Sequence, residues 1–74
     1  MKITAYHGNY RKYDVKETKS KKEAEKFLNR CFNNHAYYQK NTSLYFKIDD
    51  SDFLLYNEAR IYLGFEPVPG KFLK

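Results

Sequence analysis

The sequence contains one cysteine, Cys31, no tryptophan, three glycines and two prolines. A single cysteine excludes an intramolecular disulfide, and two scattered histidines cannot complete a cysteine-based zinc site with it. No apolar run approaches the roughly 20 residues that a membrane-spanning helix needs. The first residues also lack the apolar segment of a secretory signal peptide. The sequence therefore predicts an intracellular (cytoplasmic) protein that makes no membrane contact.

The 74 residues are enough for one small domain, which we expect to span residues 1–74. Eight tyrosines and six phenylalanines supply the large side chains from which a short chain can build a core. Disordered segments are poor in aromatic residues, so this composition favours a folded domain. The abundance of Lys, Asn, Tyr, Phe and Ile is typical of AT-rich codons and suggests an origin in a low-GC genome, a phage or a mobile element.

The first half of the sequence predicts a hairpin followed by a helix. Residues 2–6 and 10–15 are β-prone and flank a turn at His7, Gly8 and Asn9. Ser20 and Glu23 form a capping box that starts a helix, and Asn33 and Asn34 are suited to end it. Apolar residues at helical spacing give this helix one continuous stripe: Ala24, Phe27, Leu28, Cys31 and Phe32.

The second half of the sequence predicts another hairpin, a second helix and a tail. Residues 36–40 and 43–48 are the expected strands of the hairpin, with Leu44, Phe46 and Ile48 on the buried face. An acidic, cap-rich junction at residues 49–52 precedes an expected helix over residues 53–63.

Gly64 is placed to end this second helix, and both prolines follow it in the tail, residues 65–74. Apolar residues of the tail, Phe65, Val68, Phe72 and Leu73, are expected to fold back on the body. The predicted fold is α+β: a small antiparallel sheet from two hairpins with two helices packed on one face, in the order β-β-α-β-β-α, and a short C-terminal tail.

The positive charge is concentrated in the first half of the chain. Residues 1–34 carry nine basic and four acidic side chains, whereas residues 35–74 carry five of each, so the net charge of +5 lies entirely in the first part. Two interpretations stay open: a surface for phosphates or an acidic partner, or an ordinary solvated helix face. The residues of the candidate basic surface are Arg11, Lys12, Lys16, Lys19, Lys22, Lys26 and Arg30.

Tyrosines beside lysines suggest a stacking platform for bases. Tyr45 and Lys47 are expected on the outward face of their strand, and Tyr37 could lie beside them in the neighbouring strand. Aromatic rings next to lysines on an open sheet face are a common way of holding single-stranded nucleic acid. Tyrosine is also a favoured strand residue in any sheet, which explains the same pattern without a ligand.

The second helix is expected to be apolar on two sides. A core-facing side is predicted from Leu55, Tyr56, Ala59, Tyr62 and Leu63, while Leu54 and Ile61 fall on the other side. Either the tail covers Leu54 and Ile61, or these residues form an interface with a protein partner or a second copy of the chain.

No motif in the sequence predicts catalysis, a cofactor or a metal site. Tyr6-His7-Gly8 resembles the histidine-containing first-strand motif of ADP-ribosyltransferases, in which the histidine helps to bind the NAD ribose. The match spans three residues, and a hairpin turn accounts for the same residues. Asp49, Asp50 and Asp52 lack the calcium-loop pattern and fit helix capping.

The sequence therefore favours a small, basic, non-enzymatic protein that binds nucleic acid or a nucleic-acid-processing protein complex. The alternative is a protein–protein interaction module or inhibitor, or a homodimer, that uses the second helix and the tail and makes no contact with nucleic acid.

Overall fold

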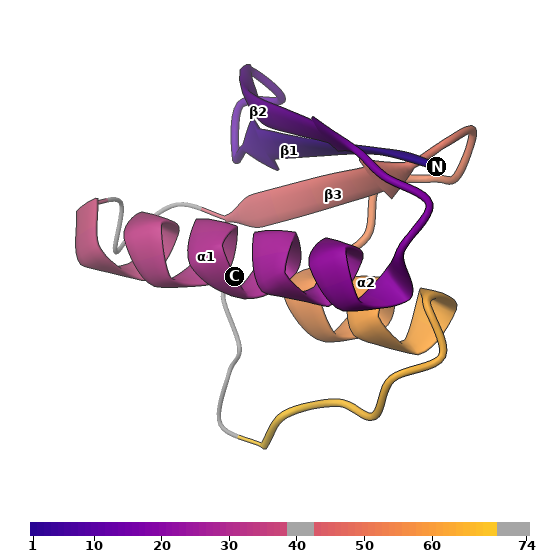
Figure 1. Cartoon of the computed structure of the whole chain (residues 1–74). Coiled ribbons are helices and arrows are strands. Elements are labelled where there is room, and N and C mark those ends of the chain that lie inside the picture. Colours follow the sequence, from indigo (N-terminus) through magenta and orange to yellow (C-terminus); the bar gives the residue numbers. More distant parts are fainter. Residues whose placement is uncertain (39–42, 70–74) are drawn as a thin grey trace.

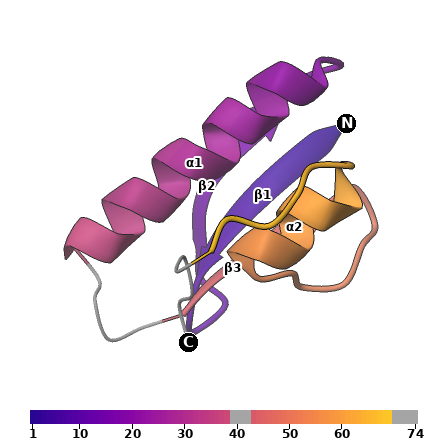
Figure 2. The same cartoon turned by 90° about the horizontal axis from the view of Figure 1, so that it is seen from below.

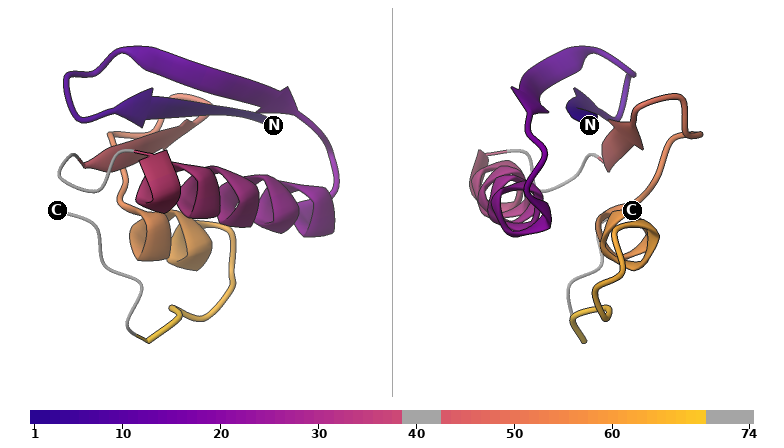
Figure 3. Two further views of the ribbon diagram at one scale, coloured as in Figure 1. Left: turned by 90° about the vertical axis from the view of Figure 1, so that its left-hand side faces the viewer. Right: turned by 45° about the vertical axis from the view of Figure 1, so that its right-hand side comes forward.

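The computed structural model describes residues 1–38 and 43–69. Its elements are β1 (Lys2–His7), β2 (Lys12–Glu17), α1 (Lys21–Tyr38), β3 (Leu44–Ile48) and α2 (Tyr56–Tyr62). The three strands form one antiparallel sheet in the order β2-β1-β3. Both helices lie on the same side of this sheet (Figures 1 and 3). The α+β class and the helical layer on one face of the sheet are as the sequence predicts. The first hairpin is also present, but its second strand runs over Lys12–Glu17 and not over residues 10–15, because Tyr10 and Arg11 belong to the turn.

β1 is the central strand, and its register aligns the apolar residues of the sheet on one face. Ile3 lies opposite Ile48 and Ala5 lies opposite Phe46, and all four are buried. α1 carries the chain from β2 across the sheet to β3. Figure 2, seen from below, shows α1 and α2 next to each other beneath the sheet. The core lies between these two layers.

α1 begins as the sequence predicts but extends further. The backbone N–H of Glu23 donates to the Ser20 hydroxyl at 3.2 Å, and all five residues of the apolar stripe are buried. The predicted end at Asn33 and Asn34 is wrong, because His35 lies one turn after Cys31 and is buried as part of the same stripe. The two asparagines are exposed within the helix.

The first strand of the predicted second hairpin is therefore wrong for residues 36–38, which belong to the last turn of α1. The rest of that strand, residues 39–40, and the turn after it lie outside the described residues. β3 matches the predicted alternation, with Leu44, Phe46 and Ile48 buried.

The segment between β3 and α2 is extended where the sequence predicts helix. Leu54 forms an isolated bridge with Phe46, in which each backbone N–H donates to the other residue's carbonyl at 2.7 Å. α2 therefore begins only at Tyr56, and its first turn is closed by Glu58, whose carboxylate accepts the Leu55 N–H at 2.8 Å. Pairing with β3 commits the backbone N–H and carbonyl of Leu54 to Phe46, so the first helical hydrogen bond of α2 is the one from the Ala59 N–H to the Leu55 carbonyl, at 2.8 Å.

The acidic junction was predicted to cap the second helix, and this prediction is wrong, because α2 begins four residues after Asp52. Asp49 has a left-handed φ of 53° and its carboxylate accepts the backbone N–H of Lys2 at 2.8 Å. Ser51 Oγ accepts the backbone N–H of Ile48 at 2.9 Å. These polar side chains close the turn that follows β3.

α2 buries Tyr56 and Ala59, and its C-cap residue Leu63 is buried as well. Leu55 and Tyr62, which the sequence places on the same side, are exposed. The helix has seven residues and presents a single narrow face to the core. Gly64 has a φ of 94° and ends the helix as predicted, because this conformation is readily adopted only by glycine.

The tail folds back on the body over its described part. Phe65 and Val68 pack against the core, and the Asn57 amide holds Val68 by accepting its N–H at 2.8 Å and donating to its carbonyl at 3.1 Å. Phe72 and Leu73 lie outside the described residues.

Candidate nucleic-acid interface

The sheet face opposite the helices carries the residues that the sequence predicts as a stacking platform. Tyr45 and Lys47 alternate with Leu44, Phe46 and Ile48, which are buried against the helices, so they point to the other face. The register adds a row across the three strands, Lys12–Tyr6–Tyr45, because directly paired residues share a face.

Four rings meet on this face and are called here the aromatic cluster: Tyr6, Tyr10, Tyr45 and Phe53. Tyr10 stacks on Tyr45 with ring centroids 5.3 Å apart and planes 14° apart. The Phe53 centroid lies 4.7 Å from that of Tyr10, 5.1 Å from that of Tyr6 and 6.0 Å from that of Tyr45. The ammonium of Lys47 lies 4.7 Å from the Phe53 centroid, at cation–π distance. The cluster thus combines stacked rings with a positive charge.

The rings of the cluster differ in exposure. Tyr10 is 57% exposed and Phe53 is 38% exposed, while Tyr6 and Tyr45 are half-buried beneath them. Tyr45 therefore supports the outer rings, and the ring surfaces open to solvent belong mainly to Tyr10 and Phe53.

The backbone of Tyr10 is held in an unusual conformation. Its φ is 62°, in the left-handed region that bulky residues rarely adopt and that costs about 1–3 kcal/mol. The turn fixes it through two backbone hydrogen bonds: the Tyr10 N–H donates to the His7 carbonyl at 2.8 Å, and the His7 N–H donates to the Arg11 carbonyl at 2.9 Å. A strained residue that displays an exposed ring is typical of a functional position.

Tyr6, Tyr10 and Phe53 are absent from the sequence-based set. Tyr6 could have been found from strand alternation combined with the β1–β3 register. Phe53 could not, because only the bridge between Leu54 and Phe46 turns it to this face. Tyr37 was expected beside Tyr45, but it lies in the last turn of α1, so that prediction is wrong.

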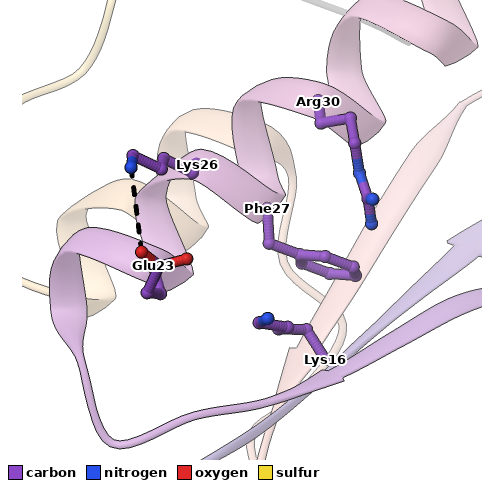
Figure 4. Close-up of a pocket in the computed structure, with 5 residues that line it drawn as sticks. All are labelled: Lys16, Glu23, Lys26, Phe27 and Arg30. Atoms are coloured by element: carbon purple, nitrogen blue, oxygen red, sulfur yellow. Dashed lines mark ion pairs between the residues drawn. The ribbon is translucent and has the colours of Figure 1, made fainter.

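The candidate basic residues do not form one continuous patch. Arg11 and Lys12 lie at the β1–β2 turn, and Lys19 and Lys22 lie near the start of α1. The other three, Lys16, Lys26 and Arg30, line a groove between β2 and α1 together with Glu23 and Phe27 (Figure 4). The predicted basic residues thus fall into three groups: one at each end of β2, and one in the groove between β2 and α1.

Charges on the outer sheet face are also unevenly placed. A shallow hollow beside the aromatic cluster is lined by Lys2, Thr4, Tyr6, Lys47, Asp49 and Asp50. Its carboxylates lie at the end of β3, whereas Lys12 and Arg11 lie at the opposite end, near Tyr10. An anionic ligand is therefore favoured at the Tyr10 end and disfavoured at the Asp49 end.

The two residues of the predicted protein interface have different environments. Leu54 is partly buried and packs against the core. Ile61 is 58% exposed and its neighbour Tyr62 is 56% exposed, so the tail through residue 69 does not cover this side of α2.

The single cysteine of the chain, Cys31, is buried in the core. Burial raises the pKa of the Cys31 thiol to about 12, and nearby Asp14 acts in the same direction, so this thiol is protonated and unreactive at neutral pH. Among residues 1–38 and 43–69, no three His, Cys, Asp or Glu side chains gather closely enough to hold a metal ion. No helix in the same part of the chain is long and apolar enough to cross a membrane.

His7 is the first residue of the turn that contains Tyr10. Its ring is 4.9 Å from Tyr13 and 5.8 Å from His35, measured between centroids, and its buried Nδ1 has no hydrogen-bond partner among the described residues. Burial lowers the pKa of His7 below its ordinary value of 6.5, and His35 and Arg11 act in the same direction.

This lowered pKa makes stability depend on pH. The unfolded chain binds the proton of His7 more tightly than the folded protein, so the free energy of unfolding is expected to fall as the pH drops from above 6.5 through the lower folded pKa. His7→Phe keeps a ring against Tyr13 and is expected to flatten this dependence. Urea unfolding of both proteins at about pH 5 and about pH 7.5 measures it. An equal pH dependence in the variant would contradict the assignment to His7.

Comparison of the chain with protein-family models, with curated proteins and with solved structures found no match.

Proposed function

We propose that this protein binds single-stranded nucleic acid on the helix-free face of its sheet. The observation that carries the proposal is the aromatic cluster, in which the partly exposed rings of Tyr10 and Phe53 lie beside the Lys47 ammonium. Unpaired bases stack on such rings with a gain of about 1–3 kcal/mol per base, and lysines neutralise the phosphates.

The shape of the surface favours single strands over duplexes. Bases in a duplex are already stacked on each other, so their faces are not available to protein rings. The row Lys12–Tyr6–Tyr45 crosses three strands, a span of about 10 Å, which suits a few splayed nucleotides.

The net charge of +5 supports the same function, because the sign favours association with a polyanion. Stacking and phosphate neutralisation involve no covalent reaction, so we propose a binding function without enzymatic activity. Whether the biological ligand is a free strand or part of a nucleoprotein complex, the contacts proposed here are with the strand.

The second candidate function is a protein interface on α2, favoured by the exposure of Ile61 and Tyr62. The described residues do not indicate what would cover these side chains. We therefore prefer the nucleic-acid function.

Fluorescence anisotropy with labelled single-stranded DNA, single-stranded RNA and duplex DNA tests the proposal. We expect dissociation constants near the micromolar range for single strands, roughly tenfold weaker binding to the duplex, and affinity that falls with salt. Ile61→Gln serves as a control on the helical side and is expected to bind like the unmodified protein.

Two outcomes would overturn the proposal: no binding to either single strand, or binding to the duplex that equals or exceeds it. Loss of single-strand binding in Ile61→Gln would also contradict it, because that side chain lies on α2 and not on the sheet face.

A further inference from the structure

A groove between β2 and α1 gathers cations around an apolar floor. It is lined by Lys16, Glu23, Lys26, Phe27 and Arg30 and has a volume of about 130 Å³. Figure 4 shows the Phe27 ring between the side chains of Lys16 and Arg30. The ring is 4% exposed, and the Arg30 guanidinium lies 5.4 Å from its centroid. The floor of the groove is therefore fixed by the core.

The charges of the groove are available to an anion. Arg30 pairs with Asp14 at 2.9 Å and Lys26 pairs with Glu23 at 3.7 Å, but all four side chains are between 43% and 65% exposed. Exposed pairs of this kind contribute about 0–1 kcal/mol each, so breaking them to bind an anion costs little free energy. No ion pair between described residues involves Lys16. Lys16, Lys26 and Arg30 carry three positive charges against the two carboxylates of Glu23 and Asp14, which leaves a net charge of +1 at the groove.

The groove also lies on the path of a single nucleic-acid strand that extends from the aromatic cluster. Lys12, at the end of the row of Tyr45 and Tyr6, is two residues before Asp14 on β2, and Asp14 contacts Arg30. A nucleic-acid strand that crosses the sheet along this row of residues therefore reaches the β2 edge of the sheet next to Arg30, at one end of the groove. The carboxylates of Asp49 and Asp50 disfavour the route along β3.

We propose that this groove binds backbone phosphates of a single strand that extends from the aromatic cluster over the edge of β2. The inference rests on the proposed function, and it adds a second, sequence-independent contact. Arginine and lysine around a fixed floor suit phosphate oxygens, with Arg30 able to form paired hydrogen bonds. Such a contact positions the strand and makes binding depend on its length.

The test compares oligonucleotides of about 4 and about 12 nucleotides, because a short strand fills the cluster alone whereas a long one reaches the groove. The double variant Lys26→Gln and Arg30→Gln removes two groove charges. The matched control, Lys19→Gln and Lys22→Gln, removes two exposed charges that do not line the groove.

We expect the groove variant to bind the longer strand at least about fivefold more weakly. The slope of log affinity against log salt concentration is expected to become shallower by roughly 0.7 for each phosphate contact that is lost. The control variant loses the same charge and is expected to bind both strands slightly and equally more weakly, by about twofold or less. The groove variant is expected to lose no more affinity than the control for the short strand.

Equal losses in the groove and control variants would overturn the inference, since the effect would then be one of net charge. An equal loss for the short strand would overturn it as well, since the groove would not be an extension. Failure of the unmodified protein to bind either strand would instead overturn the proposed function itself. If inorganic phosphate and an acidic peptide weaken long-strand binding equally, the groove is a general anion site and the inference also fails.

Discussion

Replacing Phe46 with alanine is expected to lower the free energy of unfolding by about 3–5 kcal/mol. Phe46 is fully buried in the middle of β3, opposite Ala5, and its backbone also holds Leu54. A domain of this length has a total stability of roughly 4–11 kcal/mol, so the loss removes a large part of it. Urea unfolding followed by circular dichroism measures the change.

The adjacent substitution Tyr45→Ala is expected to reduce stability less than Phe46→Ala does and to weaken single-strand binding strongly. Tyr45 points to the other face, where it pairs with Tyr6 and supports the ring of Tyr10. Loss of the cross-strand pair with Tyr6 costs about 0.2–1 kcal/mol of stability, and loss of the ring contacts with Tyr10 and Phe53 adds about 0.5–1.5 kcal/mol. Loss of the support for Tyr10 is expected to weaken single-strand binding about tenfold, because stacking contributes 1–3 kcal/mol per base.

The two variants differ by one position on the same strand, so together they separate packing from binding. If Tyr45→Ala destabilises the fold as strongly as Phe46→Ala, the outer rings are a second core and not a binding surface. If Tyr45→Ala leaves single-strand affinity unchanged, the stacking model is wrong.

Tyr10→Gly is expected to weaken single-strand binding about tenfold or more while changing stability by less than about 1 kcal/mol. Glycine adopts the observed φ of 62° without strain, which relieves about 1–3 kcal/mol. Loss of the ring contacts with Tyr45 and Phe53 costs about 0.5–1.5 kcal/mol for each pair, and the greater freedom of glycine in the unfolded chain costs a further 0.5–1 kcal/mol or so. The opposing effects on stability nearly cancel, whereas the effect on binding has no compensation.

Tyr10→Phe is the matched control, because it keeps both the ring and the strained backbone. It is expected to retain affinity within about threefold, since stacking uses the ring face and not the hydroxyl. A destabilisation of more than about 2 kcal/mol in Tyr10→Gly would show that Tyr10 serves the fold. Unchanged binding in Tyr10→Gly would remove the most exposed ring from the proposed surface.

The sequence predicts those parts of the fold that local patterns determine. The Ser20 cap and the spacing of Leu28 and Cys31 place α1 correctly, and alternation in β3 assigns Tyr45 and Phe46 to opposite faces. The end of α1 was missed because the asparagines suggested a stop, although His35 continues the buried stripe. A histidine at an apolar spacing was the available signal.

Other features depend on contacts between distant segments. Phe53 belongs to an apolar run that favours helix locally, and only hydrogen bonds between Leu54 and Phe46 make it extended. Likewise, the left-handed conformation falls on Tyr10 and not on Gly8 or Asn9, because the turn is closed from His7 to Arg11. Two of the four rings in the aromatic cluster were therefore beyond local sequence analysis.

The strand order β2-β1-β3 implies that the two sides of the central strand are completed at different stages of folding. β1 and β2 are joined by a short turn and can pair early, whereas Ile3 and Ile48 meet only after the chain has passed through all of α1. The entropy of closing that long loop must be overcome before the β1–β3 contacts form. Until β3 docks, one edge of β1 is unpaired and able to pair with another chain. The docking of β3 therefore both completes the core and ends the period in which a newly made chain is most exposed to misassembly.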